Sequence, residues 1–260
     1  MITSSSNSQV KNLIQLTKKA KARKDQGLFV VEGKKMFREL PAAMREQVYV
    51  SEAFLAGEEN REMLNGIDYE TLSDSVFRSV CDTQTPQGIL ALARMQCYKL
   101  PELLKGVHGQ RPHLLILESI QDPGNLGTMF RTGEGAGVTG ILMNHTTVDV
   151  YNPKTIRATM GSIYRVPFYI TEDFKQTVRQ LQQQGVRLYA AHLDGAQSYD
   201  EPDYTQGCGF MIGNEGNGLS DALASLADAR IRIPMEGQVE SLNAAIAATL
   251  LMYEVNRQRR

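Results

Sequence analysis

The feature that most constrains the fold is a strand, loop and helix pattern that occurs twice near the C-terminus. An apolar run, Gly209-Phe-Met-Ile212, leads into the glycine-rich turn Gly213-Asn-Glu-Gly-Asn-Gly218. A second apolar strand, Ile231-Arg-Ile233, leads into a loop and then a helix that opens at Ser241-Leu-Asn243. Ligands of open α/β sheets bind beyond the carboxyl ends of strands, so we expect both loops at one functional edge. A tight turn without a ligand is the alternative for the glycine-rich segment taken alone.

The second half of the chain alternates apolar strands with helices, which predicts an α/β fold. Strands buried on both faces appear as continuous apolar runs, and this is typical of a parallel sheet. The predicted strands are 114–118, 140–143, 165–169, 186–191, 209–213 and 230–233. The predicted helices are 125–136, 153–161, 172–184, 219–226 and 242–257.

The first half predicts a smaller α/β/α domain that ends near residue 95. Its predicted strands are 28–32, 48–50, 69–72 and 88–93, and its predicted helices are 7–24, 34–43, 58–64 and 74–81. The stretch after it is rich in Lys, Pro and Gly and is typical of a linker. We therefore expect a domain over residues 1–97, a linker over 98–111 and a second domain over 112–260.

Composition excludes several classes of protein. Apolar residues make up 42% of the chain and charged residues 22%, as in soluble globular proteins. There is no run of about 18 apolar residues that would span a membrane, and the N-terminus has no secretory apolar core. The three cysteines lack the spacing of a disulfide framework or of zinc ligands, so we expect no bound metal. We expect a cytoplasmic location. Neither a P-loop nor a Gly-x-Gly-x-x-Gly dinucleotide motif opens either domain.

The charge is unevenly distributed, although the net charge is only −1. Residues 1–24 contain basic side chains and no acidic one, and the C-terminus is basic as well. Clustered basic charge favours phosphate binding, because neutralised phosphates release their counterions. A solvated helix face is the alternative interpretation. The residues expected to contact nucleic-acid phosphates on this interpretation are Lys11, Lys18, Lys19, Arg23 and Lys24.

The segment between Asp122 and Arg131 joins the first strand of the second domain to its helix. Pro123-Gly124 forms a turn, and Asn125 suits the N-cap position of the helix. A polar substrate or an anion binds readily at such a helix start. A simple cap at Asn125 and a solvated Arg131 remain the alternatives.

Three blocks of this sequence resemble the motifs of the SpoU (TrmH) branch of the SPOUT methyltransferases. The blocks are Leu117–Thr132, Ile212–Ser220, and Ile233–Met235 with Ser241–Ala247. Residues 149–161 are similar to the middle segment of that family, and the N-terminal domain resembles its L30e-like substrate-binding domain. The resemblance implies 2′-O-ribose methylation of structured RNA with S-adenosylmethionine. It also implies a deep trefoil knot in the C-terminal segment and a homodimer that forms through the last helix.

The resemblance also implies roles for particular residues. Gly213, Ile233 and Leu242 match positions that contact S-adenosylmethionine, with Leu193 added at an earlier strand end. Arg131 matches the catalytic arginine of the family. A guanidinium with a pKa above about 12 is a poor base, so we expect it to orient the target phosphate and hydroxyl.

Three further residues complete the expected catalytic site, and a fourth has a structural role. Asn125 and Asn243 are expected to orient Arg131 or the ribose, and Glu215 to pair with Arg131 or to stabilise its loop. Ser241 is expected to cap the final helix.

The final helix carries more apolar surface than one buried face needs. One apolar set is Leu242, Ile246, Leu250 and Tyr253, and a flanking set is Ala245, Thr249 and Met252. We expect the flanking set to form the dimer contact, so that a charge at Ala245 or Met252 gives monomers. If both sides of the helix are core instead, the same charge would unfold the domain.

Ribosomal RNA is the expected substrate because of the additional N-terminal domain, and tRNA is the alternative. A non-catalytic RNA-binding or ribosome-assembly protein on the same scaffold is a rival, and so is another nucleotide enzyme. Neither the modified nucleotide nor a housekeeping or drug-resistance role follows from the sequence.

Overall fold

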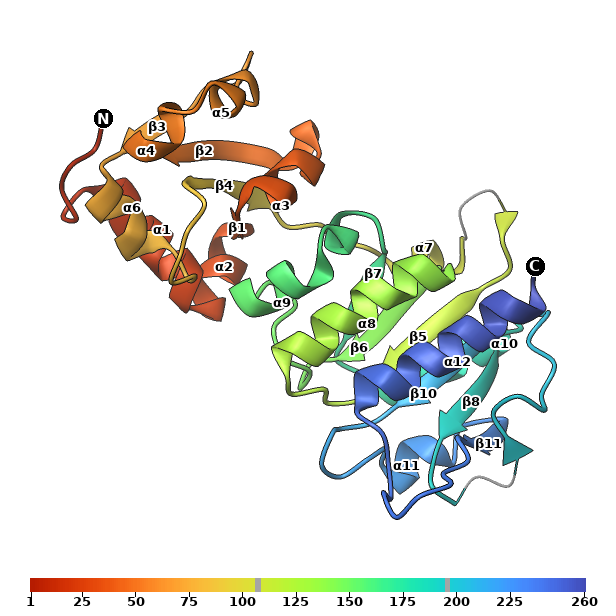
Figure 1. Cartoon of the computed structure of the whole chain (residues 1–260). Helices are drawn as coiled ribbons and strands as arrows, with labels where there is room; N and C mark the ends of the chain where they lie inside the picture. The colour runs from red at the N-terminus through yellow and green to blue at the C-terminus, as the bar shows by residue number, and fades with distance from the viewer. Residues whose placement is uncertain (106–108, 195–196) are drawn as a thin grey trace. The chain divides into compact units, whose positions relative to one another are not determined.

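The computed structural model describes residues 1–105, 109–194 and 197–260. These residues form two compact units (Figure 1). The N-terminal unit comprises Met1–Gln96 and Asp149–Tyr164, and the C-terminal unit comprises Cys97–Val148 and Arg165–Arg260. The chain therefore enters the N-terminal unit twice. No helix of the described residues is long and apolar enough to cross a membrane.

The N-terminal unit is built on a four-stranded mixed sheet with strand order β1-β4-β2-β3. Its strands are β1 (Leu28–Glu32), β2 (Arg45–Ser51), β3 (Glu70–Leu72) and β4 (Ile89–Arg94). Its helices are α1 (Ser8–Lys18), α2 (Ala20–Gln26), α3 (Lys34–Glu39), α4 (Glu52–Leu55), α5 (Glu58–Glu62), α6 (Asp74–Val80) and α9 (Pro153–Thr159). Apolar side chains of α1 and α6 pack on one face of this sheet and form a core cluster.

The single helix predicted over 7–24 is two helices that break at Lys19. Lys19 has an extended backbone, with φ −122° and ψ 115°. Beyond the break, the Arg23 guanidinium donates to the carbonyls of Leu16 (2.7 Å) and Thr17 (3.2 Å), in the last turn of α1. The arginine thus satisfies helix-end carbonyls that would otherwise lack partners.

The segment Asp149–Tyr164 packs against the first strand of the N-terminal unit. Helix α9 lies beside β1, and the Tyr151 ring lies 4.7 Å from that of Phe29 between centroids. The hydroxyl of Tyr164 donates to the carbonyl of Met36 at 3.2 Å. The middle segment of the methyltransferase region is therefore structurally part of the N-terminal unit.

The C-terminal unit contains a seven-stranded sheet with order β7-β6-β5-β10-β8-β11-β9. Every strand pair in it is parallel, as predicted. Its strands are β5 (His113–Leu117), β6 (Gly140–Asn144), β7 (Phe168–Thr171), β8 (Arg187–Ala191), β9 (Gln197–Ser198), β10 (Cys208–Ile212) and β11 (Ala229–Arg232). Its helices are α7 (Leu100–Leu104), α8 (Pro123–Ala136), α10 (Phe174–Gln183), α11 (Asp221–Ala224) and α12 (Ala244–Gln258).

Helices cover both faces of this sheet. Side chains from α7, α10 and α11 form one core cluster with β5, β8 and β10. Helices α8 and α12 lie side by side over the sheet (Figure 1).

Helix α7 lies within the predicted linker 98–111, and its Leu103 is fully buried. A side chain at Gly140 would clash with Leu103, at 2.4 Å, so this segment packs closely against the sheet. Residues 106–108 of the predicted linker lie outside the described residues.

The faces of α12 are the reverse of the sequence-based prediction. Ala245 and Met252 are buried, with Met252 0% exposed, because they face the unit's own core. The exposed side chains are Ile246 (54%), Leu250 (37%) and Tyr253 (42%). The prediction that a charge at Ala245 or Met252 would yield monomers is therefore wrong. Periodicity correctly identified two apolar sets, but it did not tell which set faced inward.

Candidate active site

A cavity of about 470 Å³ lies where three loops of the C-terminal unit converge. One loop follows β5, another follows β10, and the third follows β11 and leads into α12. The lining residues are Gln121, Asp122, Asn125, Glu215, Ser241, Leu242, Asn243 and Ala244. The cavity is therefore at the carboxyl edge of the parallel sheet, where such folds bind ligands.

Helix α8 begins at Pro123, and Asp122 rather than Asn125 is its N-cap. The Asp122 carboxylate accepts from the backbone N–H of Asn125 at 2.8 Å. Proline suits the first helical position because it has no N–H that would need a partner there. The prediction of Asn125 as the cap is wrong by three positions. Its side chain is thereby available for contacts across the cavity.

Glu215 joins the glycine-rich loop to the loop after β5. Its carboxylate accepts from the backbone N–H groups of Gln121 (2.9 Å) and Asp122 (3.0 Å) and from Asn125 Nδ2 (3.0 Å). Partial burial raises the pKa of Glu215. These hydrogen bonds together lower the pKa by more than burial raises it, so the pKa lies below its ordinary value. Glu215 is thus an ionised acceptor, and its role is to hold the two loops together.

The amide of Asn125 bridges Glu215 and Asn243. Its Nδ2 donates to the carboxylate, and its Oδ1 accepts from Asn243 Nδ2 at 3.0 Å. The Oδ1 of Asn243 accepts from the backbone N–H groups of Ala245 (2.9 Å) and Ile246 (3.3 Å). Asn243 is therefore the N-cap of α12, and the prediction of Ser241 as the cap is wrong. One chain of hydrogen bonds connects all three loops.

The glycine-rich loop closes tightly on itself after β10. A Cβ at Gly213 would lie 2.0 Å from the backbone nitrogen of Leu219, so no other residue fits there. Asn214 and Gly218 exchange two backbone hydrogen bonds, and Asn214 Oδ1 accepts from the N–H of Gly216 at 2.9 Å. Gly213 is required because two segments of backbone meet at that position.

Sequence reasoning missed Ser119, which anchors the first loop. Ser119 has a φ of +58°, which is uncommon for a residue other than glycine. Its N–H donates to Asn144 Oδ1 at 2.9 Å, and its carbonyl accepts from Asn214 Nδ2 at 2.9 Å. An asparagine directly after the predicted strand 140–143 was the available signal. These two asparagines hold the strained serine in place.

The four expected cofactor residues follow three strands that are neighbours in the sheet. Gly213 follows β10, Leu193 follows β8 and Ile233 follows β11. Leu242 precedes α12 and lines the cavity. Gly213 is buried, Ile233 and Leu242 are half-buried, and Leu193 is exposed.

Arg131 is on α8 but lies apart from the hydrogen-bonded network. It is six positions beyond Asn125, which corresponds to a rise of about 9 Å along a helix. Its side chain is exposed and forms no hydrogen bond or ion pair with the residues that the structure describes. The predicted alternative of a Glu215–Arg131 pair is therefore wrong, because Glu215 is held by Gln121, Asp122 and Asn125.

The expected RNA-binding residues separate into two groups. Lys11, Lys18, Lys19 and Lys24 are exposed on α1, α2 and the residue between them. Arg23 is 3% exposed, and its guanidinium is ion-paired with Asp149 at 2.5 Å. Arg23 is therefore a structural residue, and we remove it from the set expected to bind RNA.

Comparison with known proteins relates both parts of the chain to RNA methyltransferases. Residues 112–253 match the family model of the SpoU rRNA methylases. Residues 7–91 match the model of the MRM3-like substrate-binding domain. The chain is 34% identical to the 23S rRNA (guanosine(2553)-2′-O)-methyltransferase RlmP of Bacillus subtilis (strain 168), over 98% of both proteins.

Solved structures give the same relationship. An S-adenosylmethionine-bound rRNA methyltransferase from Sinorhizobium meliloti matches with a TM-score of 0.82 and 30% identity, over 98% of this chain and 97% of that one. The SpoU methyltransferase AviRb from Streptomyces viridochromogenes, in complex with the same cofactor, matches with a TM-score of 0.86. At 24% identity over 97% of this chain and 98% of that one, AviRb supports the fold alone. The chain has the fold of these enzymes and belongs to the SpoU rRNA methylase family.

Proposed function

We propose that this protein transfers the methyl group of S-adenosylmethionine to ribose 2′-hydroxyl groups of ribosomal RNA. The observation that carries the proposal is the hydrogen-bonded chain from Glu215 through Asn125 to Asn243. It connects all three loops that resemble the motifs of the family, at the edge of the sheet where ligands bind. The printed activity of the Bacillus subtilis relative supports ribosomal RNA as the substrate class.

The cavity fits a cofactor of this kind. Its volume of about 470 Å³ is within the usual range for small-molecule sites. The two carboxylates in its lining, Asp122 and Glu215, already accept hydrogen bonds from backbone N–H groups, so they hold the loops in place rather than anchor a ligand. Leu242 lines this cavity, and Gly213, Ile233 and Leu193, which follow neighbouring strands at the same edge of the sheet, would complete the cofactor site. When bound, S-adenosylmethionine supplies a methyl group activated on a sulfonium.

The residues of the chain contribute orientation rather than proton abstraction. Glu215 has a depressed pKa and accepts three hydrogen bonds, so it is a poor base. Asn125 and Asn243 fix the relative positions of the loops. The Arg131 guanidinium has no partner within the described part of the chain, which suits binding of the target phosphate and hydroxyl. Aligning the nucleophile with the methyl group supplies much of the rate enhancement in such a displacement.

The N-terminal unit is proposed to hold the RNA. Four exposed lysines on α1, α2 and their junction, Lys11, Lys18, Lys19 and Lys24, provide positive charge for phosphates. The matched substrate-binding model over residues 7–91 supports this role. We therefore assign the RNA-binding function to the N-terminal unit and the transferase function to the C-terminal unit, which includes α7 of the expected linker 98–111. A ribosomal RNA substrate would place the reaction in the cytoplasm.

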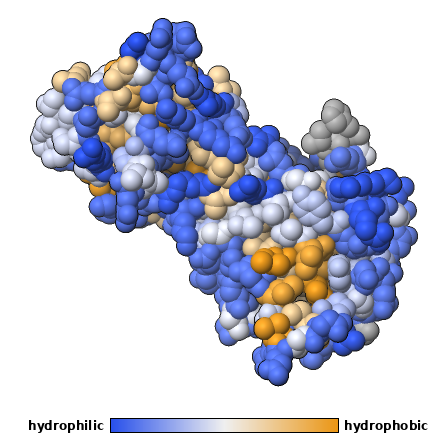
Figure 2. Space-filling view, viewed as in Figure 1, coloured by the Kyte–Doolittle hydropathy of each residue, from blue (hydrophilic) through white to orange (hydrophobic). Residues whose placement is uncertain are grey.

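We further propose that the protein is a homodimer that forms through α12. Figure 2 shows an apolar patch on the surface of the C-terminal unit, and α12 exposes Ile246, Leu250 and Tyr253. Large exposed apolar side chains along one helix face mark an interaction surface. Arg131 projects from the neighbouring helix α8 and lies outside the cavity of its own chain. A second copy would bring another Arg131 to this interface, which suits a site completed by both copies.

Cofactor titration and methyl transfer test the proposal. We expect calorimetry to detect binding of S-adenosylmethionine and not of NAD. With radiolabelled cofactor, label should enter ribosomal RNA rather than purified tRNA. Label in tRNA alone would change the substrate, and cofactor binding without transfer to any RNA would favour a non-catalytic role. The absence of cofactor binding would refute the proposal.

A further inference from the structure

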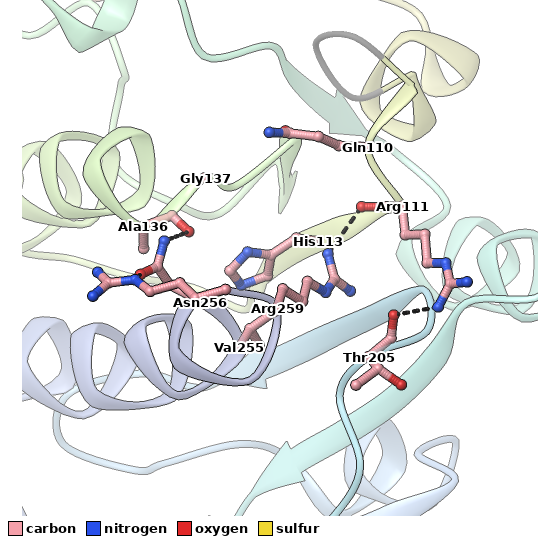
Figure 3. Close-up of a pocket in the computed structure, with 10 residues that line it drawn as sticks. Gln110, Arg111, His113, Ala136, Gly137, Thr205, Val255, Asn256 and Arg259 are labelled. Carbon is pink, nitrogen blue, oxygen red and sulfur yellow. Dashed lines mark hydrogen bonds between the residues drawn. The ribbon is translucent and has the colours of Figure 1, made fainter.

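A second cavity, of about 480 Å³, lies at the opposite edge of the C-terminal sheet. It forms where β5 begins and where α8 and α12 end (Figure 3). His113 is the first residue of β5, whereas the loop to the candidate active site follows Leu117 at its other end. The two cavities are thus separated by the length of that strand and share no lining residue.

His113 lines this cavity as a buried side chain with an unpartnered nitrogen. The residue is 1% exposed, and its Nε2 has no hydrogen-bond partner among the described residues. The imidazole is hydrogen-bonded to the backbone of Gly137. The N–H of Gly137 already donates to Glu134, so the Gly137 carbonyl is the group that accepts from the ring.

The protonation state of His113 determines whether its unpartnered nitrogen, Nε2, is a hydrogen-bond donor or an acceptor. Burial lowers the pKa of His113 to about 3, and the nearby charge of Arg259 lowers it as well, against the hydrogen bond to Gly137. The ring is therefore neutral at physiological pH and carries one N–H, which Gly137 uses. Nε2 is left as a buried acceptor with no donor in the described parts of the chain. An unmet buried polar atom of this kind costs about 1–3 kcal/mol and calls for an explanation.

The rim of the cavity is cationic. Arg259 is committed to the structure, because it donates to the backbone carbonyls of Tyr204 (2.9 Å) and Arg111 (3.0 Å). Arg111 uses one nitrogen on the carbonyl of Thr205, and Arg260 uses one nitrogen on the side chain of Asn256. Their remaining N–H groups have no partner among the described residues. Among the described residues no Asp or Glu side chain lines the cavity, whereas three arginines do, so positive charge predominates in its lining.

We infer that this cavity is a second ligand site that takes a ribonucleotide. The phosphate would bind the free N–H groups of Arg111 and Arg260, since guanidinium groups match phosphate oxygens in geometry and charge. A ribose hydroxyl or a base amino group would donate to His113 Nε2. The same chemistry is available from one nucleotide of an RNA strand and from a free nucleotide. The inference goes beyond the proposed function, because it concerns neither the cofactor cavity nor the lysines of the N-terminal unit.

Binding measurements on the full-length protein test the site and its source of ligand. The probes are 5′-AMP and a twelve-nucleotide RNA, both with saturating S-adenosylhomocysteine to block the cofactor site. The test variant is Arg111→Gln with Arg260→Gln, two positions at the rim. The control is Lys175→Gln with Arg179→Gln, which removes the same charge from the exposed surface of α10. We expect at least tenfold weaker binding in the test variant and less than a twofold change in the control.

The outcomes separate the alternatives. A selective loss for RNA alone, or for 5′-AMP alone, supports the site and identifies its ligand source. Equal affinity in wild type and test variant would overturn the inference. Equal losses in test and control variants would also overturn it, because they would indicate only general attraction to positive charge. In the unmodified protein, the ¹⁵N resonance of His113 Nε2 should shift on ligand addition, and an unchanged resonance would refute the role of His113.

Discussion

Glu215 stabilises the candidate site by joining segments that are 94 residues apart in sequence. It accepts three hydrogen bonds from the first loop, and the Asn125 amide extends the connection to the start of α12. Because a carboxylate is only an acceptor when ionised, it fixes which way the Asn125 amide points. Orientation of the site thus depends on a single charge.

Glu215→Gln should therefore disturb the site more than its size suggests. The Gln amide would bring N–H groups toward the N–H groups of Gln121 and Asp122. We expect at least a tenfold loss of methyl transfer, but only about 1 kcal/mol of stability because the carboxylate is exposed to solvent. Glu201→Gln, at an exposed site away from the cavity, is the matched control. Initial rates and urea unfolding measure the two effects, and an unchanged rate would contradict this role.

The same substitution has a defined pH dependence. The folded pKa of Glu215 lies below its unfolded value, so its contribution to stability is present above the unfolded pKa. The contribution is lost as the pH falls through the folded pKa. The stability difference between wild type and Glu215→Gln should therefore shrink under acid conditions.

Arg23 and Lys24 are adjacent in sequence but should behave oppositely. Arg23→Gln breaks a mostly buried ion pair with Asp149 and removes two caps from α1, so we expect a loss of about 3 kcal/mol in stability. Lys24→Gln should leave stability unchanged, weaken RNA binding and reduce its salt dependence. Urea unfolding and RNA titration at several salt concentrations measure both. Weaker RNA binding by Arg23→Gln without lower stability would contradict the structural role.

Sequence identified the residues of the network but not their individual contacts. Asn125, Glu215 and Asn243 do meet, because motif loops that follow parallel strands share one edge. The caps were assigned wrongly, to Asn125 and Ser241 instead of Asp122 and Asn243. Several residues in each segment are good caps, and backbone geometry alone decides among them. Ser119 was missed because serine rarely adopts a positive φ, so its residue type gives no sign of this backbone conformation.

At the scale of elements, α12 has one face in the core and one face exposed. Ala245, Ala248 and Met252 are buried, whereas Ile246, Leu250 and Tyr253 are exposed beside them. Sequence periodicity predicted a helix with two apolar sets, and the structure confirms the helix. Which set is buried depends on the rotation of α12 against α8 and the sheet, which a helical pattern does not fix.

Charges on the two faces of α12 should have different consequences. Ile246→Glu should give a folded monomer with little activity, because the proposed dimer contact would bury an unpaired charge. Met252→Glu should unfold the C-terminal unit, at a cost of about 4 kcal/mol or more, because Met252 is in the core. Sedimentation and circular dichroism distinguish the two results. A fully active dimer of Ile246→Glu would exclude this face as the interface.

Among the elements, the parallel strands of the C-terminal unit were the best predicted. Their continuous apolar runs identify these strands from local sequence alone, without knowledge of which strands they pair with. The break at Lys19 was not predictable, because the contacts that accompany it are tertiary: Arg23 donates to carbonyls of α1 and pairs with the distant Asp149. The short elements β9 and α7 were not predicted either, because each is too short to show a periodic apolar pattern. The trefoil knot stays a prediction.

At the scale of the whole molecule, the two compact units do not coincide with two continuous stretches of chain. Residues 149–164 come from the region that matches the methylase model, yet they pack on β1 of the N-terminal unit. The tyrosines Tyr151 and Tyr164 both contact residues of the first hundred. Removing the N-terminal residues would therefore also deprive this segment of its packing partners.

A fragment of residues 97–260 should fold only in part. We expect the seven-stranded sheet to remain protected from hydrogen exchange, because its core clusters come from the C-terminal unit. Residues 150–164 should lose the protection that they have in the full-length protein, since β1 is absent. Hydrogen exchange with mass spectrometry on both proteins measures this. Full protection of 150–164 in the fragment would show that the segment does not depend on the N-terminal unit.

Methyl transfer to ribosomal RNA by wild type and Arg131→Ala tests the central claim most directly. Mass spectrometry of the digested RNA should find a 2′-O-methylated nucleotide with the wild type. The Arg131→Ala variant should bind S-adenosylmethionine with unchanged affinity and fold normally, because the side chain is exposed and unengaged among the described residues. Its kcat and kcat/KM should fall together by at least about a hundredfold, as for a group that acts in the transition state. Methylation on a base instead of a ribose, or near-wild-type turnover by the variant, would contradict the account.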